Sequence, residues 1–152
     1  MSSRMNPYSV APKAMQAMID LAERLREDAL EPSLMELVKI RVSQINGCAF
    51  CLHMHTSDAR KQGEAEERIH LLPAWRESGM FTPRERAALA WTEALTLITQ
   101  GHAPDEVYAE VAAHFEPVEI VRLTLEITTI NAWNRIAIGF RSVHPHERAL
   151  AR

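Results

Sequence analysis

Apolar residues recur at intervals of three and four along almost the whole chain, which is the spacing that places them on one side of an α-helix. The recurrence is clearest near the N-terminus, where the stripe consists of Ala14, Met15, Met18, Leu21, Ala22 and Leu25. No segment shows the convincing alternation of apolar and polar residues that marks a half-buried β-strand. The sequence therefore predicts an all-α protein, a single bundle of about six to seven helices.

Helix-breaking and helix-capping residues divide this pattern into separate helices. The Asn-Gly pair ending at Gly47 is a strong stop signal, and Gly63 ends the following helix. Thr82, Pro83 and Glu85 supply the N-cap, the first-turn proline and the acid of a capping box. The helices expected from these signals cover residues 11–28, 33–46, 48–62, 64–77, 83–100, 105–115 and 117–142, with a break allowed at Pro73.

The length and the charge of the chain limit its organisation and its partners. Its 152 residues fit one domain over residues 1–152, in which we expect residues 1–10 and 143–152 to be loosely ordered tails. A net charge of −3 without a basic stripe disfavours nucleic acid and anionic membranes as partners. The N-terminus has no signal-peptide pattern, and charged and amide side chains interrupt the longest apolar stretch. We therefore expect a cytoplasmic protein without a membrane span.

The chain has only two cysteines, Cys48 and Cys51, which lie three residues apart. A secreted disulfide framework would spread its cysteines over distant segments, whereas a close pair in a reducing compartment indicates redox or metal chemistry. Because Gly47 ends one helix, both cysteines fall in the first turn of the next, where free amides and the helix dipole favour a thiolate. The dipole supplies at most about 1 kcal/mol, or roughly 0.7 pKa unit, so a second activator is needed.

His55 is the candidate for this activator. It follows Cys51 by four residues, so the two side chains share one face of the helix. His53 lies about 200° around the helix from Cys51 and is excluded from the site. Asp58 continues the face of His55, where it either orients the imidazole or is an ordinary surface charge.

Glu36 is the third candidate group, on the predicted helix that precedes the cysteines. If the next helix folds back antiparallel, Glu36 and His55 lie about 16 Å and 10 Å from the turn, and the gap of about 6 Å can be closed by two side chains or one water. A carboxylate at this place would hold the tautomer of the imidazole and assist proton removal from the thiol. The alternative is a surface salt bridge of Glu36 with Lys39 or Arg41.

Two other interpretations of the cysteine pair stay open. The thiols are either small buried apolar groups or, together with His55 and Glu36, the ligands of a tetrahedral zinc ion. Structural zinc sites usually draw their ligands from two separated segments, and the sequence shows no second Cys/His pair.

Polar residues also interrupt the last, strongly apolar helix. Asn131, Asn134 and Arg135 must find partners if they are buried, so they either line the site or fix a subunit interface. The apolar content of several helices exceeds what one face needs, which favours burial between subunits of a homo-oligomer.

Glu36 followed by Cys48-x-x-Cys51-x-x-x-His55 resembles the signature of the AhpD-like alkylhydroperoxidase family, within the carboxymuconolactone decarboxylase superfamily. The similarity extends over most of the chain, from Glu36 through residues 81–86 to residues 131–135. The resemblance implies an AhpD-like, all-helical fold and a homo-oligomer, whether dimer, trimer or hexamer. Some peroxidases of the family carry a histidine where this chain has Phe50.

The resemblance further implies a thiol-dependent peroxidase that reduces small organic hydroperoxides or hydrogen peroxide and needs neither cofactor nor metal. Cys51 would become a sulfenic acid, Cys48 would resolve it as a disulfide, and a dithiol of the thioredoxin or lipoyl type would restore both thiols. His55 and Glu36 would relay the proton. The order of the cysteines stays open, because a thioredoxin-like arrangement makes the first the more acidic. The rival functions are a lactone-processing or decarboxylating enzyme and a non-catalytic redox-sensing protein.

Overall fold

The computed structural model describes residues 3–27, 30–144, 146 and 149, and the elements in these residues are all helical. The all-α class predicted from the periodicity is therefore confirmed. The α-helices are α1 (Pro7–Val10), α2 (Pro12–Glu27), α3 (Pro32–Asn46), α4 (Ala49–Lys61), α5 (Glu66–Leu71), α6 (Pro83–Thr96), α7 (Ile98–Gly101), α8 (Asp105–Ala112) and α9 (Pro117–Phe140), and a short 3₁₀ turn, η1, covers Leu72–Ala74.

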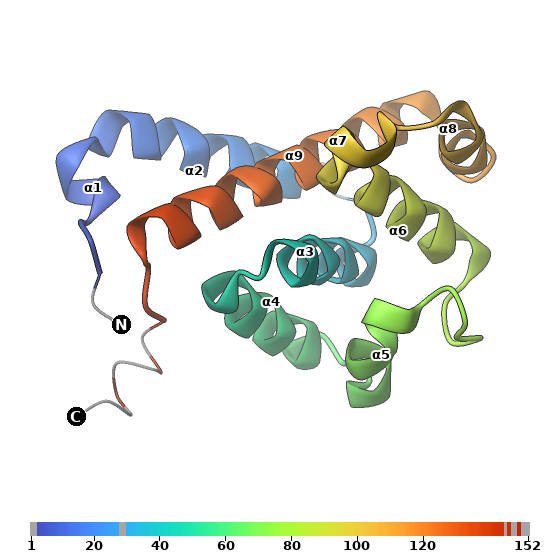
Figure 1. Cartoon of the computed structure of the whole chain (residues 1–152), viewed down its shortest axis with the longest axis horizontal. Coiled ribbons are helices and arrows are strands. Elements are labelled where there is room, and N and C mark those ends of the chain that lie inside the picture. The colour runs from blue at the N-terminus through green and yellow to red at the C-terminus, as the bar shows by residue number, and fades with distance from the viewer. Residues whose placement is uncertain (1–2, 28–29, 145, 147–148, 150–152) are drawn as a thin grey trace.

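Helix α3 is the centre of the molecule and packs against α4, α6 and α9 (Figure 1). Leu37, Val38, Ile40 and Val42 of this helix are completely buried, as expected for a helix that is covered on several sides. The long helix α9 crosses one side of α3 and also carries α2, while α4 lies on another side of α3. This arrangement places the start of α4 close to the middle of α9.

The turn between α3 and α4 is made by Gly47, which has a φ of 68° and lies in the left-handed region. Its amide donates to the carbonyl of Gln44 at 3.3 Å, and the amide of Cys48 donates to Ser43 at 3.0 Å. These two bonds close the C-terminus of α3 in a turn that glycine adopts without strain. The chain reverses within two residues, so α4 begins with Cys48 as its N-cap and runs back along α3.

The expected helix boundaries agree with the structure at most ends, and two of the expected helices are each divided into two elements. At the start of α6 the capping box is present, because Glu85 donates its amide to the Thr82 hydroxyl at 3.2 Å and accepts from the Thr82 amide at 2.8 Å. The helix expected over 64–77 consists of α5 and η1, and the helix expected over 83–100 is broken at Leu97 into α6 and α7.

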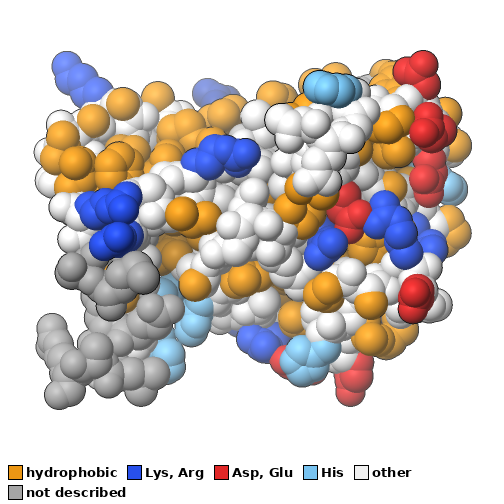
Figure 2. Space-filling model, viewed as in Figure 1, with side chains coloured by type: hydrophobic (Ala, Val, Ile, Leu, Met, Phe, Trp, Pro, Cys, Tyr) orange, Lys and Arg blue, Asp and Glu red, His pale blue; other side chains and the backbone are white. Residues whose placement is uncertain are grey.

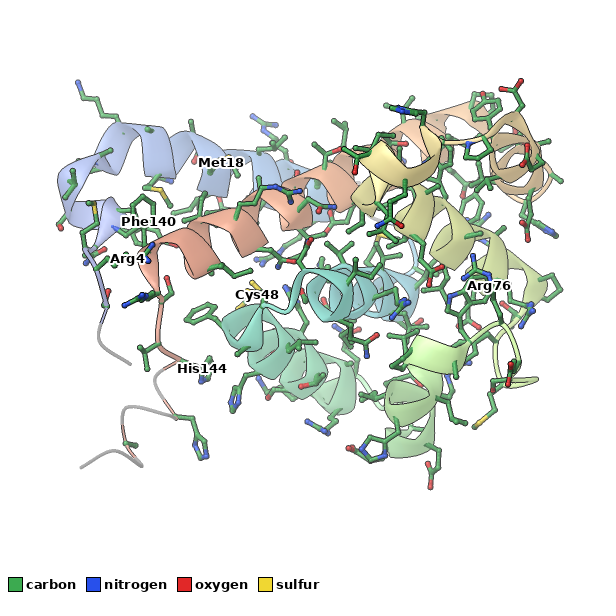
Figure 3. The ribbon with its side chains drawn as sticks, in the orientation of Figure 1. Arg4, Met18, Cys48, Arg76, Phe140 and His144 are labelled. Atoms are coloured by element: carbon green, nitrogen blue, oxygen red, sulfur yellow. The ribbon has the colours of Figure 1, made fainter. Side chains whose placement is uncertain are left out.

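Residues 3–10 differ from the loosely ordered tail that we expected. They contain α1, and the Arg4 amide donates to the carbonyl of Phe140 at 3.0 Å, so the N-terminal segment is bound to the end of α9. Figure 3 shows Arg4 and Phe140 side by side. Most of the second expected tail, residues 143–152, lies outside the described residues. None of the described helices combines the length and the apolar character that crossing a bilayer requires.

Candidate active site

A cavity of about 510 Å³ lies between α1, α2, α4 and α9. Most of its wall is apolar, formed by side chains that include Tyr8, Ile19, Phe50, Met54, Ile130 and Trp133. The polar part of the wall includes Cys51, His55, Lys39 and Glu126. A largely apolar cavity with a few reactive groups is the usual form of a site for a small organic molecule.

The two cysteines lie at the start of α4, with Cys48 at the N-cap and Cys51 in the first turn. Figure 3 shows Cys48 where the chain passes from α3 into α4. Both residues are free thiols and nearly fully buried, at 1% and 2% exposure, and Cys51 is the one that lines the cavity. A small molecule in the cavity would therefore meet the sulfur of Cys51.

The two thiols ionise differently. A hydrogen bond from the Cys51 thiol lowers the pKa of Cys48 to about 7; burial opposes this effect, and the backbone amides of Cys51 and Phe50 support it. The same hydrogen bond raises the pKa of Cys51, burial and the charge of Cys48 add to the rise, and the amide of Asn134 acts in the opposite sense. Because the two thiols interact strongly, the low value belongs to the pair, which releases its first proton near neutral pH.

This origin of the low pKa differs from our expectation. We expected His55 to be the second activator beside the helix start, whereas the largest favourable contribution at Cys48 comes from the neighbouring thiol. The reason is position: Cys48 is the N-cap and Cys51 the first-turn residue, so their side chains meet across the end of the helix.

The structure brings Glu36 and His55 into direct contact. The Nδ1 atom of His55 lies 2.9 Å from Oε2 of Glu36, and each residue is 7% exposed. Burial would raise the pKa of Glu36, but the hydrogen bond to His55 and the ionic contact with Lys39 outweigh it and lower that pKa. An ionised carboxylate only accepts hydrogen bonds, so Nδ1 of His55 is the donor in this contact and Nε2 faces away from Glu36.

Lys39 and Glu126 complete the polar wall. The Lys39 ammonium lies 3.2 Å from Oε1 of Glu36 and 3.1 Å from Oε1 of Glu126, so it joins α3 to α9. Glu36 is buried and contacts both His55 and Lys39, so the alternative that it is only a surface acid is wrong, although the contact with Lys39 is present. Arg41, the other expected partner, instead binds Glu93 at 2.8 Å. Sequence reasoning missed Glu126 as a site residue, although a charge in an otherwise apolar helix was the available signal.

Asparagines fix the end of α3 that carries the cysteines. Asn46 Nδ2 donates to Oδ1 of Asn131 at 2.9 Å and to Oδ1 of Asn134 at 3.0 Å. Asn134 is fully buried and donates to the Ser43 hydroxyl at 3.1 Å. Asn131 and Asn134 thus find partners within the chain and hold α9 against the end of α3, and neither is among the residues that line the cavity. Arg135 is exposed and binds Asn131.

The groups that come closest to a metal-binding set are Glu36, His55 and Asp58, whose ligand atoms lie within 4.8 Å of one another. In the part of the chain that the structure describes, this is the one such set, and it contains neither cysteine, unlike the zinc site considered above. Glu36 already binds His55 and Lys39, and Asp58 binds Lys61 at 2.8 Å. Glu36, His55 and Lys39 thus form an ion-pair network, and Asp58 pairs with Lys61. His53, which we excluded, lies against His144, with 3.7 Å between the ring centroids.

An all-helical fold with a Cys-x-x-Cys pair at a helix start, beside a Glu/His pair, defines a protein of the AhpD-like class. Comparison with family models agrees, since the model of the carboxymuconolactone decarboxylase family matches residues 12–94. The chain belongs to this family. The match contains every cysteine and both members of the Glu36/His55 pair.

The relatives include the uncharacterised protein YdfG of Bacillus subtilis, which is 48% identical over 91% of this chain and 95% of its own length. A crystal structure of an Agrobacterium tumefaciens protein, proposed to be an AhpD-type antioxidant defence protein, superposes with a TM-score of 0.92 at 44% identity, covering 95% of this chain and 99% of that one. A peroxidase-related protein from Silicibacter superposes with a TM-score of 0.78 at 19% identity, over 90% of this chain and 72% of that one, and shares the fold. The AhpD-like fold is thus confirmed.

Proposed function

We propose that this protein is a thiol-dependent peroxidase that reduces hydroperoxides with its cysteine pair. The observation that carries the proposal is the shared wall of the cavity, where Cys51 of an ionised pair lies with His55, which Glu36 holds in one tautomer. Family membership supports a peroxidase-related or decarboxylase-like activity, and the paired thiols favour the peroxidase.

In the proposed reaction the Cys51 thiolate attacks the terminal oxygen of a hydroperoxide. A sulfur–oxygen bond forms, the oxygen–oxygen bond breaks, and the leaving alkoxide takes a proton and departs as an alcohol. Cys48 then attacks the sulfenic sulfur of Cys51, forming the disulfide and releasing water. The peroxide gains two electrons and the cysteine pair loses two.

Access to the cavity is the reason to assign the first attack to Cys51, although Cys48 has the lower pKa. The pair holds one negative charge and one proton, so transfer of that proton from Cys51 to Cys48 moves the anion to the sulfur that faces the substrate. His55, one helical turn away on the same cavity wall, is the group that supplies or accepts the further proton.

The cycle needs an external reductant, for which we propose a dithiol protein of the thioredoxin or lipoyl type. Because sulfur carries the electrons, the proposal includes no bound cofactor or metal. A reactive dithiol requires a reducing compartment, so we place the protein in the cytoplasm as part of the same proposal.

The test is the mass of the intact protein after addition of a hydroperoxide and again after addition of a dithiol. We expect a loss of two hydrogens per chain that the dithiol reverses, with one alcohol formed per cycle. Cys48→Ser should stop at a sulfenic acid that dimedone traps at Cys51, and Cys51→Ser should not turn over. A sulfenic acid at Cys48 would reverse the assigned order, and turnover by Cys51→Ser would exclude the proposal.

The same preparations separate the rival functions. If a variant with both cysteines replaced by alanine still turned over a lactone, the activity would be of the decarboxylase type. Slow oxidation that occurs once per chain, without recycling, would favour a redox-sensing protein.

A further inference from the structure

We propose that Lys39 and Glu126 are positioning residues that act through Glu36 to hold His55 in the state that can accept a proton. The inference rests on the proposed function for its catalytic meaning. Its structural part concerns a chain of charges that crosses three helices, from Glu126 on α9 through Lys39 and Glu36 on α3 to His55 on α4.

The contacts form a linear series in which each oxygen of Glu36 has its own partner. Oε2 lies 2.9 Å from Nδ1 of His55, and Oε1 lies 3.2 Å from the Lys39 ammonium. The ammonium in turn lies 3.1 Å from Glu126. All four side chains are 9–14% exposed, so water screens these charges only weakly.

The charge of Lys39 affects how strongly Glu36 holds a proton on the imidazole of His55. A carboxylate with no other partner would hold a proton on the neighbouring imidazole strongly, because the two opposite charges attract at close range. A protonated imidazole has no free lone pair and cannot serve as a base. By neutralising part of the charge of Glu36, Lys39 lets the imidazole lose its proton while Glu36 still fixes its orientation.

Glu126 has the opposite effect on the same group. The Glu126 carboxylate offsets the charge of Lys39, so Glu36 keeps enough negative charge to attract the imidazole of His55. Among the other charges near His55, Asp58 binds Lys61, and Glu23 and Arg26 of α2, of opposite sign, are exposed on the cavity wall. The buried Cys48/Cys51 pair at the start of α4 also titrates near neutral pH, and it is unchanged in the variants below. Lys39 and Glu126 are the buried ion pair that acts on the imidazole through Glu36.

The two residues predict opposite effects, which a merely structural role would not produce. Lys39→Met removes the cation, so the proton should stay on His55 to a higher pH, by about one pH unit. Glu126→Gln leaves the cation unbalanced, so the proton should leave at a lower pH. Lys39→Arg should behave as the wild type, and the double variant Lys39→Met/Glu126→Gln should return towards it.

Two readouts test the inference. The imidazole carbon signals of His55, assigned in a ¹³C-histidine-labelled protein by their loss in His55→Gln, report the change of protonation with pH and need no activity. The low-pH limb of the peroxide reaction should move in the same direction as these signals. Urea unfolding of each variant identifies any that do not fold. If Lys39→Met does not fold, the test is the downward shift in Glu126→Gln and the unchanged midpoint in Lys39→Arg.

Opposite shifts in the two single variants would support the inference, and shifts of the same sign or no shift would overturn it. The outcomes also separate the two proposals. Opposite shifts of the His55 signals in a protein without peroxide turnover would support the positioning role and refute the proposed peroxidase function. Peroxide turnover with unchanged His55 signals would support the peroxidase function and refute the positioning role.

Discussion

Cys48 and Cys51 are joined by a hydrogen bond in which the second thiol stabilises the anion of the first. This donor and the amides at the helix start outweigh the cost of burying a thiolate, so the pKa of Cys48 is lowered to about 7 although the residue is 1% exposed. The consequence is a division of roles, since Cys48 has the lower pKa but does not line the cavity, whereas Cys51 does.

The first prediction concerns this ionisation. Absorbance at the thiolate band of the reduced protein should rise with a midpoint near pH 7, with an amplitude of one thiol per chain, because the pKa of Cys48 is lowered to about 7. Cys48→Ser should abolish the transition in this range. Cys51→Ala, which removes the donor, should move the midpoint up, whereas Cys51→Ser, which keeps a hydroxyl donor, should move it less. A midpoint near 9 in the wild type would contradict the structure.

The second prediction concerns Glu36. Glu36→Gln keeps the shape of the side chain but removes the charge that fixes His55, so peroxide-dependent oxidation should slow by about 100-fold, within the usual range for lost acid–base assistance. Stopped-flow measurement of thiol oxidation gives the rate. Asp58→Asn is the matched control, because Asp58 lies near the same imidazole but binds Lys61; an equal loss there would refute a specific role of Glu36.

The residue types of the site and their spacing could be read from the sequence, whereas their hydrogen-bond partners came from the structure. Helix geometry brings together residues at the spacing of Glu36, Cys48, Cys51 and His55, so their proximity could be predicted. Lys39 and Glu126 are 87 residues apart, and their contact depends on how α9 crosses α3, which local periodicity does not determine.

Gly47 is the element-scale feature on which the site depends, because it ends α3 and sets where α4 starts. A Cβ at this position would meet no atom within 4 Å, so the requirement for glycine comes from the backbone alone. The left-handed conformation costs an L-residue about 1 kcal/mol or more.

The third prediction follows from this conformation. Gly47→Ala should lower the free energy of unfolding by about 1 kcal/mol, and Gly47→Asn by less, since asparagine tolerates the left-handed region. Gly79→Ala is the control, because that glycine also has open space around it but no positive φ, so its stability should not fall in this way. Urea unfolding measures all three, and equal losses for Gly47→Ala and Gly79→Ala would contradict the backbone explanation.

Helix boundaries with a local chemical cause could be predicted, and those set by packing could not. The Thr82 capping box and the Gly47 turn are encoded within a few residues and appear in the structure. The break at Leu97 has no proline or glycine beside it, and the apolar pattern continues through it. The segment before α1 is bound to the end of α9 through Arg4, and such a contact between distant segments cannot be predicted from local sequence.

On the scale of the whole molecule, a considerable apolar surface stays uncovered. Helix α2 has 16 residues, and Met15 is the one it buries. Helix α9 exposes Val118, Val121 and Leu125 at intervals of three and four residues. Figure 2 shows apolar side chains gathered over the end of the molecule that carries α1 and α2. Such surface is typical of subunit contacts, so the homo-oligomer expected from the sequence stays our prediction.

The fourth prediction tests this surface. Val121→Lys places a charge in the exposed row of α9 and should reduce the molar mass measured by light scattering to that of a smaller assembly. Ile98→Lys, an exposed apolar residue on α7, is the control and should leave the mass unchanged. A wild-type protein that sediments as a single chain of 17.2 kDa would show that the apolar row serves no self-association.

Two stretches of the chain form the cavity, one carrying the reactive groups and the other much of the wall. Its reactive groups all fall in residues 12–94, the part that the family model matches, whereas α1 and α9 form much of the wall and lie outside that match. The Arg4 contact holds the N-terminal segment to the end of α9, and residues 5–8 of this segment form part of the cavity wall. Substitutions in this segment would therefore change the size and shape of the molecules that fit the cavity, and they would leave Cys51 and His55 in place.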